Sequence, residues 1–272
     1  MPNKNPSDPS KAKAPADRPG LHHQSELGIA EHIAANHPTE LRYVSDERLW
    51  LTWSAAGWTS DPTGNRTQQL IIKVLRGLAP PDAEGLDYRQ QQANRQVRRW
   101  LLKQESRSSL SAFRALLSQD PRIAITSDEL NTDPDMLGTP NGIVNLESGE
   151  LREPSPSELV TQRVSVAYDP EAECPRWRRF LRETISEEPE VLQYIQTMVG
   201  YCLTGHTTVQ QMWLLIGDGA NGKSTFLNTL TDLFGAYAET AADTVLLATS
   251  RHSGSSNDIA ALQGRRLVTL SE

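Results

Sequence analysis

The chain has 272 residues, enough for one large domain or two modest ones with their own apolar cores. Hydrophobic residues make up 37% of it and charged residues 22%, as in ordinary globular proteins, and no apolar run reaches the roughly 20 residues that span a bilayer. The net charge of −7 argues against a small domain that binds DNA through its whole surface, but not against a ring enzyme with a local basic channel.

The first 20 residues contain five prolines and almost no apolar side chains. Because nothing there offsets the entropy of ordering, we predict a disordered tail over residues 1–20. The segment also lacks the apolar stretch of a secretory signal. The two cysteines, Cys174 and Cys202, form no CxxC pair, so we expect a protein of a reducing cytoplasm.

Residues 21–84 indicate a small α+β module. A short helical stripe runs from Leu27 toward Pro38, and residues 42–59 predict a hairpin. Thr67 is the expected N-cap of a helix that the next prolines stop. Three tryptophans of the hairpin either stack on nucleic-acid bases or form the core of the module, and we favour the core: Trp50, Trp53 and Trp58.

Residues 85–205 indicate a second module of helices and short strands. Its first helices, from Tyr88 onward, carry the only sizeable basic run of this acidic chain, in which Glu105 is the one acid. The basic side chains either contact the phosphates of DNA or form a solvated helix face. The candidates for phosphate contacts are Arg95, Arg98, Arg99 and Lys103.

The second half of this module changes character. The dipeptides Asn141-Gly142 and Ser148-Gly149 predict turns between short strands. Pro175 and Pro189 each open an amphipathic helix, and Gly205 follows the second of them.

Residues 217–224, GDGANGKS, fit the pattern GxxxxGK[ST]. The apolar run Met212–Ile216 before this loop predicts a buried strand, and residues 225–230 continue as a helix. Strand, glycine loop and helix stand in the order that a nucleotide-binding P-loop requires. A chance match is expected roughly once in a hundred such chains, and the correct flanks lower that chance further.

The residue types in the loop suit a phosphate chain. Glycines let backbone N–H groups come within hydrogen-bond distance of the phosphates, Lys223 supplies a positive charge, and the Ser224 hydroxyl can ligate Mg²⁺. We therefore predict that ATP phosphates are held by Gly217, Asp218, Gly219, Ala220, Asn221, Gly222, Lys223, Ser224 and Thr225.

An NTPase also needs a carboxylate at the end of a neighbouring strand. The apolar run Leu267–Leu270 predicts such a strand, and Glu272 follows it closely. We predict that Glu272 is the Walker B carboxylate, acting in catalysis with Lys223 and in Mg²⁺ binding with Ser224.

These residues resemble superfamily 3 helicases, in particular the primase–helicases of satellite phages, plasmids and poxviruses. The loop GDGANGKST with Asn221 is typical of that group, as is the lead Leu262, Gly264, Arg266 into Glu272. Upstream, residues 139–151 (TPNGIVNLESGEL) and 175–205 resemble the domain that precedes its ATPase. The likeness covers about residues 26–272.

The resemblance implies an AAA+-like α/β P-loop NTPase with an incomplete sheet over residues 206–272, preceded by a mainly helical α+β domain and the disordered tail. It also implies an ATP-dependent DNA helicase of phage or plasmid replication, with ATP and Mg²⁺ as cofactors. The expected partners are single-stranded or forked DNA and copies of the same chain in a hexameric ring, without a membrane. The expected location is the cytoplasm of a bacterial host.

Two departures from the family pattern set further expectations. Only a short polar tail precedes the matched region, so we do not predict primer synthesis. Family members continue beyond the Walker B strand with an inserted strand, a sensor residue and an arginine finger. We therefore expect an ATPase domain cut short at Glu272, with little activity of its own.

The alternative hypotheses are an inactive nucleotide- or DNA-binding fragment and a P-loop ATPase that acts on another load, such as DNA packaging.

Overall fold

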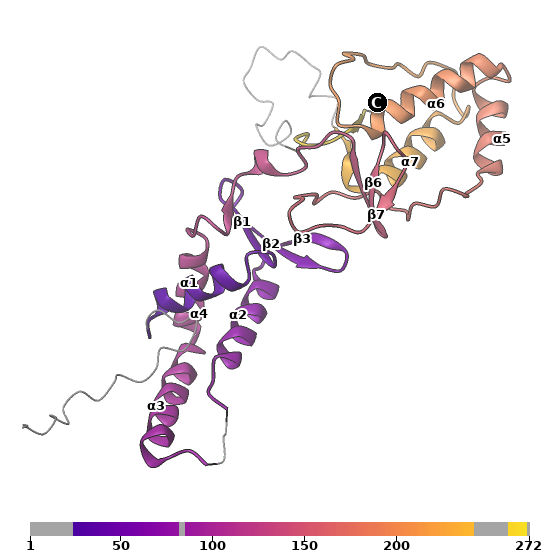
Figure 1. Ribbon diagram of the computed structural model, residues 1–272. Helices are drawn as coiled ribbons and strands as arrows, with labels where there is room; N and C mark the ends of the chain where they lie inside the picture. The colour runs from indigo at the N-terminus through magenta and orange to yellow at the C-terminus, as the bar shows by residue number, and fades with distance from the viewer. Residues whose placement is uncertain (1–23, 82–84, 242–260, 271–272) are drawn as a thin grey trace, which may run out of the picture. The chain divides into compact units, whose positions relative to one another are not determined.

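The protein is described by a computed structural model that covers residues 24–81, 85–241 and 261–270, a mixed α/β chain of helices and small sheets (Figure 1). The predicted disordered tail, residues 1–20, lies outside this described part. The chain forms two compact units, one of residues 1–50 and 61–125 and the other of residues 51–60 and 126–272. These units do not follow the boundaries at residues 84 and 205 that we expected from the sequence.

The first unit opens with helix α1, Glu26–Asn36. Ser25 caps it, because its Oγ accepts a hydrogen bond from the N–H of Gly28 at 3.0 Å. The predicted apolar stripe is confirmed at Ala30, Ile33 and Ala34, which are buried, and Ile29, which the stripe did not include, is fully buried too. Leu27, by contrast, is exposed.

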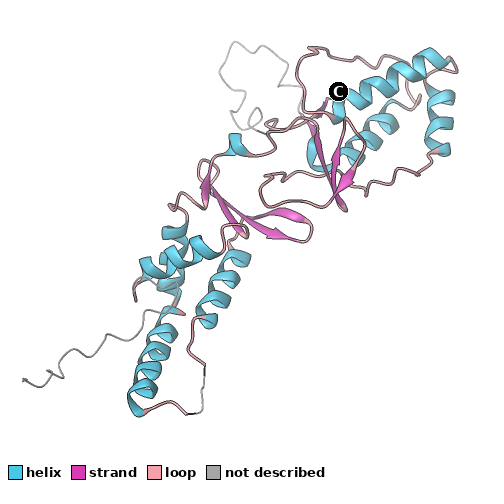
Figure 2. Cartoon of the chain, in the orientation of Figure 1, coloured by secondary structure: helices cyan, strands magenta, loops and turns pink. Residues whose placement is uncertain are grey.

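Three further helices complete this unit, and Figure 2 shows them in cyan: α2 Asn65–Gly77, α3 Tyr88–Gln104 and α4 Arg107–Leu117. Helix α3 begins with a capping box, in which Asp87 accepts from the N–H of Gln90 and the Gln90 side chain accepts from the N–H of Asp87. A single bond caps α4, in which the Ser106 hydroxyl accepts from the N–H of Ser109 at 3.2 Å.

All four helices contribute to one apolar core, and this shared core explains the division of the chain. Helices α3 and α4 had been assigned from sequence to the module that begins at residue 85. Their apolar side chains instead join those of α1 and α2, so that the four helices bury one another. The core includes Ile29, Ile33, Leu41, Ile71, Leu75, Leu101, Phe113, Leu117 and Ile123.

The predicted hairpin contains three strands rather than two: β1 Leu41–Val44, β2 Leu49–Ser54 and β3 Gly57–Asp61. They belong to a four-stranded sheet of order β3-β2-β1-β4, in which β4, Ala124–Ile125, runs parallel to β1. The core interpretation of the tryptophans is confirmed at Trp50 and Trp58, which are 8% and 0% exposed. Trp53 is partly buried and lies edge-on to Trp58.

Helix α2 begins earlier than the sequence predicted, so the assignment of Thr67 as its N-cap is wrong. Gly64 stands at the cap position in a left-handed conformation, with φ of 69° and no capping side chain. The buried carboxylate of Asp61 replaces the cap, since its Oδ2 accepts from the N–H of Thr67 at 2.9 Å and from its hydroxyl at 3.0 Å. The helix start therefore depends on a side chain from the end of β3.

We expect Asp61→Ala to destabilise the first unit by about 1–3 kcal/mol, because it leaves two buried donors of Thr67 without an acceptor. Urea unfolding followed by circular dichroism measures the loss. Glu47→Ala removes the same charge from an exposed position and serves as the control. Equal stability of the two variants would show that Asp61 does not cap α2.

The second unit contains two small sheets. Strands β5 Met136–Thr139, β6 Gly142–Asn145 and β7 Leu151–Arg152 form an antiparallel sheet, and β8 Ala238–Thr240 pairs in parallel with β9 Leu267–Thr269. The predicted turn at Asn141-Gly142 is confirmed as the link between β5 and β6. Gly142 is required there, because a Cβ atom at this position would lie 2.5 Å from the carbonyl oxygen of Arg152.

Three helices pack in this unit: α5 Pro175–Thr184, α6 Pro189–Leu203 and α7 Lys223–Phe234. Both predicted helix starts at proline are confirmed, since each proline occupies the first helical turn. Their inward side chains form one core with the small sheets, including Leu137, Val144, Ile195, Phe226, Leu230, Phe234 and Tyr237. None of the helices in the described part of the chain has the length and apolarity that crossing a membrane takes.

A partly buried arginine ties separate segments of this unit together. The guanidinium of Arg266, just before β9, donates to the carbonyl oxygens of Leu203 at 2.5 Å and Met136 at 2.8 Å. It also lies over the ring of Tyr237, with Cζ 4.4 Å from the ring centroid. Burial lowers the pKa of Arg266 and raises that of Tyr237. Arg266 thereby joins the end of α6, strand β5 and the residue before β8.

We expect Arg266→Lys to destabilise the second unit by about 2–3 kcal/mol, because an ammonium cannot reach both carbonyls and cover the ring as a planar guanidinium does. Chemical unfolding monitored by tryptophan fluorescence measures the effect. The matched control is Arg178→Lys, the same exchange at an exposed position of α5. A loss in the control as large as that in Arg266→Lys would contradict the role given to this side chain.

Candidate functional site

Helix α7 opens with free backbone donors beside the glycine loop. It begins at Lys223, directly after Gly222, which has no side chain to cap the helix. The N–H groups of the first turn have no acceptor within the helix, so this end attracts an anion. Ser224 and Thr225 are exposed, whereas Phe226 and Leu230 are buried and hold the helix against the core. Solvent can therefore reach the donors on an anchored helix.

The backbone of the loop makes two left-handed turns before the helix. Ala220 has φ of 62° and Gly222 has φ of 86°. A Cβ atom at position 222 would also lie 3.0 Å from Cγ2 of Thr184 in α5, so glycine is needed there for two reasons. At Gly219 a Cβ atom would meet nothing within 4 Å, which leaves that part of the loop open to a ligand.

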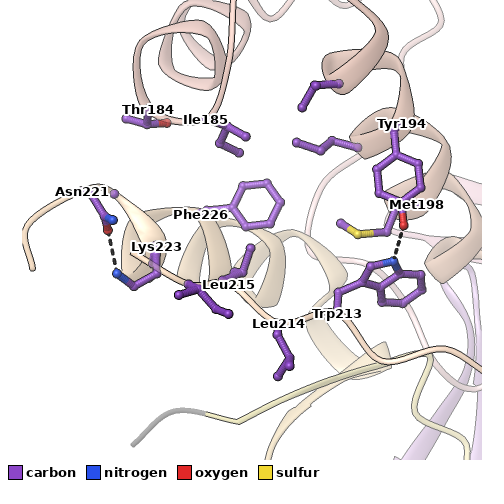
Figure 3. Close-up of a pocket in the computed structure, with 14 residues that line it drawn as sticks. Thr184, Ile185, Tyr194, Met198, Trp213, Leu214, Leu215, Asn221, Lys223 and Phe226 are labelled. Carbon is purple, nitrogen blue, oxygen red and sulfur yellow. Dashed lines mark hydrogen bonds between the residues drawn. The ribbon is translucent and has the colours of Figure 1, made fainter. Parts of the chain in front are cut away.

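Lys223 turns back over the loop that precedes it. Its Nζ donates to the carbonyl oxygens of Gly217 at 2.6 Å and Asp218 at 3.2 Å, and to Oδ1 of Asn221 at 2.9 Å. Figure 3 shows the bond between Asn221 and Lys223 at the edge of a pocket. Three of the predicted phosphate-binding residues, Gly217, Asp218 and Asn221, are thus brought together around the ammonium group of a fourth.

The predicted strand Met212–Ile216 is absent, and this expectation is wrong for the structure. The segment has no regular secondary structure, and Met212, Leu214 and Ile216 are 65%, 72% and 89% exposed. Within the described residues it has no strand to pair with. An isolated strand leaves its backbone groups without partners, so its apolar pattern alone does not produce one.

A cavity of about 360 Å³ lies beside the loop. Its walls are largely apolar, and Lys223 with Asn221 stands at one side (Figure 3). At another side Trp213 donates from Nε1 to the hydroxyl of Tyr194 at 2.9 Å, which fixes the indole against α6. The volume is in the range of sites that hold small molecules.

The predicted catalytic carboxylate, Glu272, lies outside the described residues. The predicted strand before it is confirmed in part as β9, which runs parallel to β8. Among the described residues, no cluster of histidine, cysteine or acidic side chains is arranged to hold a metal ion. Of the two predicted Mg²⁺ ligands, Ser224 is the one that lies within the described residues, and its side chain is exposed.

The four basic candidates on α3 differ in their surroundings. Arg98 donates twice to the carbonyl oxygen of Pro80, at 3.1 Å and 2.7 Å, so it fastens the segment after α2. Arg95, Arg99 and Lys103 are exposed on the same helix. These last three side chains can reach a phosphate backbone without breaking such a bond.

A second basic surface, which was not predicted from the sequence, lies on α5. This helix carries Arg176, Arg178, Arg179 and Arg182, all exposed, and Arg179 is paired with Glu183. The signal is visible in the sequence as PRWRRFLR, whose apolar members point inward while the arginines point out. Thr184 and Ile185, at the end of the same helix, line the cavity beside the loop.

Part of the chain is similar to a viral protein. A protein of Acanthamoeba polyphaga mimivirus that carries the name "Putative helicase" is 28% identical over 125 residues. The match covers 43% of this chain and 13% of the mimivirus protein, so the chain spans a small part of that protein's length.

The second finding concerns the region before the glycine loop. The family model described as "D5 N terminal like" matches residues 30–186, which run from within α1 to just beyond the end of α5. The loop at 217–224 and helix α7 follow the matched region. Because the match spans more than half of the residues, the chain belongs to the D5 N terminal like family.

Proposed function

We propose that residues 217–225 bind the phosphates of ATP and that the chain belongs to an ATP-dependent DNA helicase of superfamily 3. The observation that carries the first part is the ammonium of Lys223, held over a glycine loop at the open end of α7. The family membership and the similarity to a protein named as a helicase support the second part.

The proposed fold of the nucleotide-binding part is a P-loop NTPase of AAA+ type. The order of loop, helix α7, strand β8 and parallel strand β9 supports it, because parallel strand pairs are typical of α/β sheets. When bound, Mg²⁺ neutralises charge on the phosphates. Ser224 would hold the ion, with Glu272 as the carboxylate partner. Lys223 would bind the outer phosphates, and the α7 N–H groups would orient them.

In the full proposal, a hexameric ring couples ATP hydrolysis to movement along DNA in phage or plasmid replication. Two alternative functions keep the same nucleotide site. One is an ATPase that packages DNA, and the other is a fragment that binds nucleotide or DNA without hydrolysing ATP. Stimulation of phosphate release by single-stranded DNA separates the helicase from both.

The first test concerns the nucleotide. Lys223→Ala removes the ammonium from the loop, and we expect ATP affinity to fall about ten- to hundredfold, because charge-assisted hydrogen bonds to the phosphates are lost. Isothermal calorimetry with Mg²⁺ measures the dissociation constant.

Lys73→Ala removes an exposed lysine from α2 and is the control, for which we expect unchanged affinity. If ATP bound equally well to wild type and Lys223→Ala, the loop would not be a nucleotide site.

The second test concerns DNA. We propose that α3 contacts phosphates without reading bases, so replacing Arg95, Arg99 and Lys103 by glutamine should flatten the salt dependence of single-strand binding. Each lost contact lowers the log–log slope by about 0.7. Fluorescence anisotropy with a labelled oligonucleotide at several salt concentrations measures the slope.

The comparison variant neutralises Arg176, Arg178 and Arg182 on α5, which removes the same charge from the other basic surface. A flatter slope in this variant, with no change in the α3 variant, would move the DNA contact from α3 to α5.

A further inference from the structure

The side chain of Asn221 touches both the first glycine of the loop and the lysine that ends it. Its Oδ1 accepts from Nζ of Lys223 at 2.9 Å. Its Nδ2 lies against the α-carbon of Gly217, because a Cβ atom placed there would come within 2.1 Å of this nitrogen. The amide of Asn221 therefore connects the two ends of the loop. With the amide in this position, residue 217 must be glycine, because a Cβ atom would occupy the same space.

The ammonium of Lys223 has no donor to spare in this arrangement. An ammonium carries three N–H bonds, and here they point to three neutral oxygens: two backbone carbonyls and the side-chain carbonyl of Asn221. The two carbonyls belong to the loop itself. The Asn221 oxygen belongs to an exposed side chain that can rotate away.

We propose that Asn221 is a positioning residue that holds Lys223 in place while the loop is empty, and that its Oδ1 occupies the donor which a phosphate oxygen takes on binding. This inference rests on the proposed nucleotide site. A phosphate oxygen is charged and the amide oxygen is neutral, so the phosphate forms the stronger bond with the ammonium and displaces the amide.

Because the amide and the phosphate compete for the same donor, each substitution of Asn221 should change the affinity for phosphate in a predictable direction. When a ligand must first displace an internal acceptor, only the molecules in which the donor is free can bind it. The apparent dissociation constant then equals the intrinsic one divided by the fraction of such molecules. Asn221→Ala removes the competitor, and we expect inorganic triphosphate to bind about three- to tenfold more tightly. Asn221→Asp puts a carboxylate on the ammonium and repels the anion, so we expect binding at least about tenfold weaker.

Calorimetric titration of the full 272-residue chain with inorganic triphosphate tests this order. Asn228→Asp is the matched control, since it adds the same charge at an exposed asparagine of α7, and we expect it to stay within about twofold of wild type. Circular dichroism confirms that each variant is folded. A second measurement, the exchange rate of the Lys223 ammonium protons by ¹⁵N NMR without ligand, should rise in Asn221→Ala.

The outcomes separate the two proposals. If Lys223→Ala binds triphosphate as well as wild type, the nucleotide site itself is wrong. If Lys223→Ala loses binding while Asn221→Asp matches Asn228→Asp, the site stands and the positioning role of Asn221 is overturned. Weaker binding in Asn221→Ala would likewise overturn it, because it would show that the amide contacts the phosphate instead of competing with it.

Discussion

The second unit depends on the partly buried guanidinium of Arg266. Desolvation opposes the charge of Arg266, and the structure compensates with two backbone carbonyls and the face of an aromatic ring. Those partners come from α6, β5 and the residue before β8, which are distant in sequence. The same Tyr237 hydroxyl accepts from the N–H of Gly138 at 3.0 Å. Helix α7 ends three residues before Tyr237, so the cluster also fixes the far end of the helix that bears Lys223.

Much of the helical framework could be predicted from the sequence, because helix signals are local. Apolar spacing marked α1, and prolines marked the starts of α5 and α6. The start of α2 could not be predicted in the same way. Its capping carboxylate, Asp61, comes from the end of a strand, and only the folded chain brings it to Thr67. Likewise, no local pattern predicts that β1 pairs with β4, some eighty positions later in the printed sequence.

The residues of the candidate site could be predicted, but their contacts could not. The spacing of the glycines and Lys223 marked the loop, since that pattern carries a known mechanism. It did not show that Asn221 would span the loop, because that contact depends on left-handed turns at Ala220 and Gly222. The basic face of α5 was overlooked for another reason. Its arginines alternate with inward Trp177 and Phe180, so they do not form a run of charge in the sequence.

The absent strand at 212–216 explains why contacts inside the loop matter. Met212, Leu214, Leu215 and Ile216 are exposed along this segment, and the residues from Trp213 to Ile216 line the cavity. The apolar run alone does not produce a strand, because a strand also needs a neighbour for its backbone groups. Among the described residues, the loop is anchored at α7, where Phe226 is buried. Its other end, at Gly217, is then held by Lys223 and packed against Asn221. The geometry of the loop therefore rests on these two side chains rather than on a sheet.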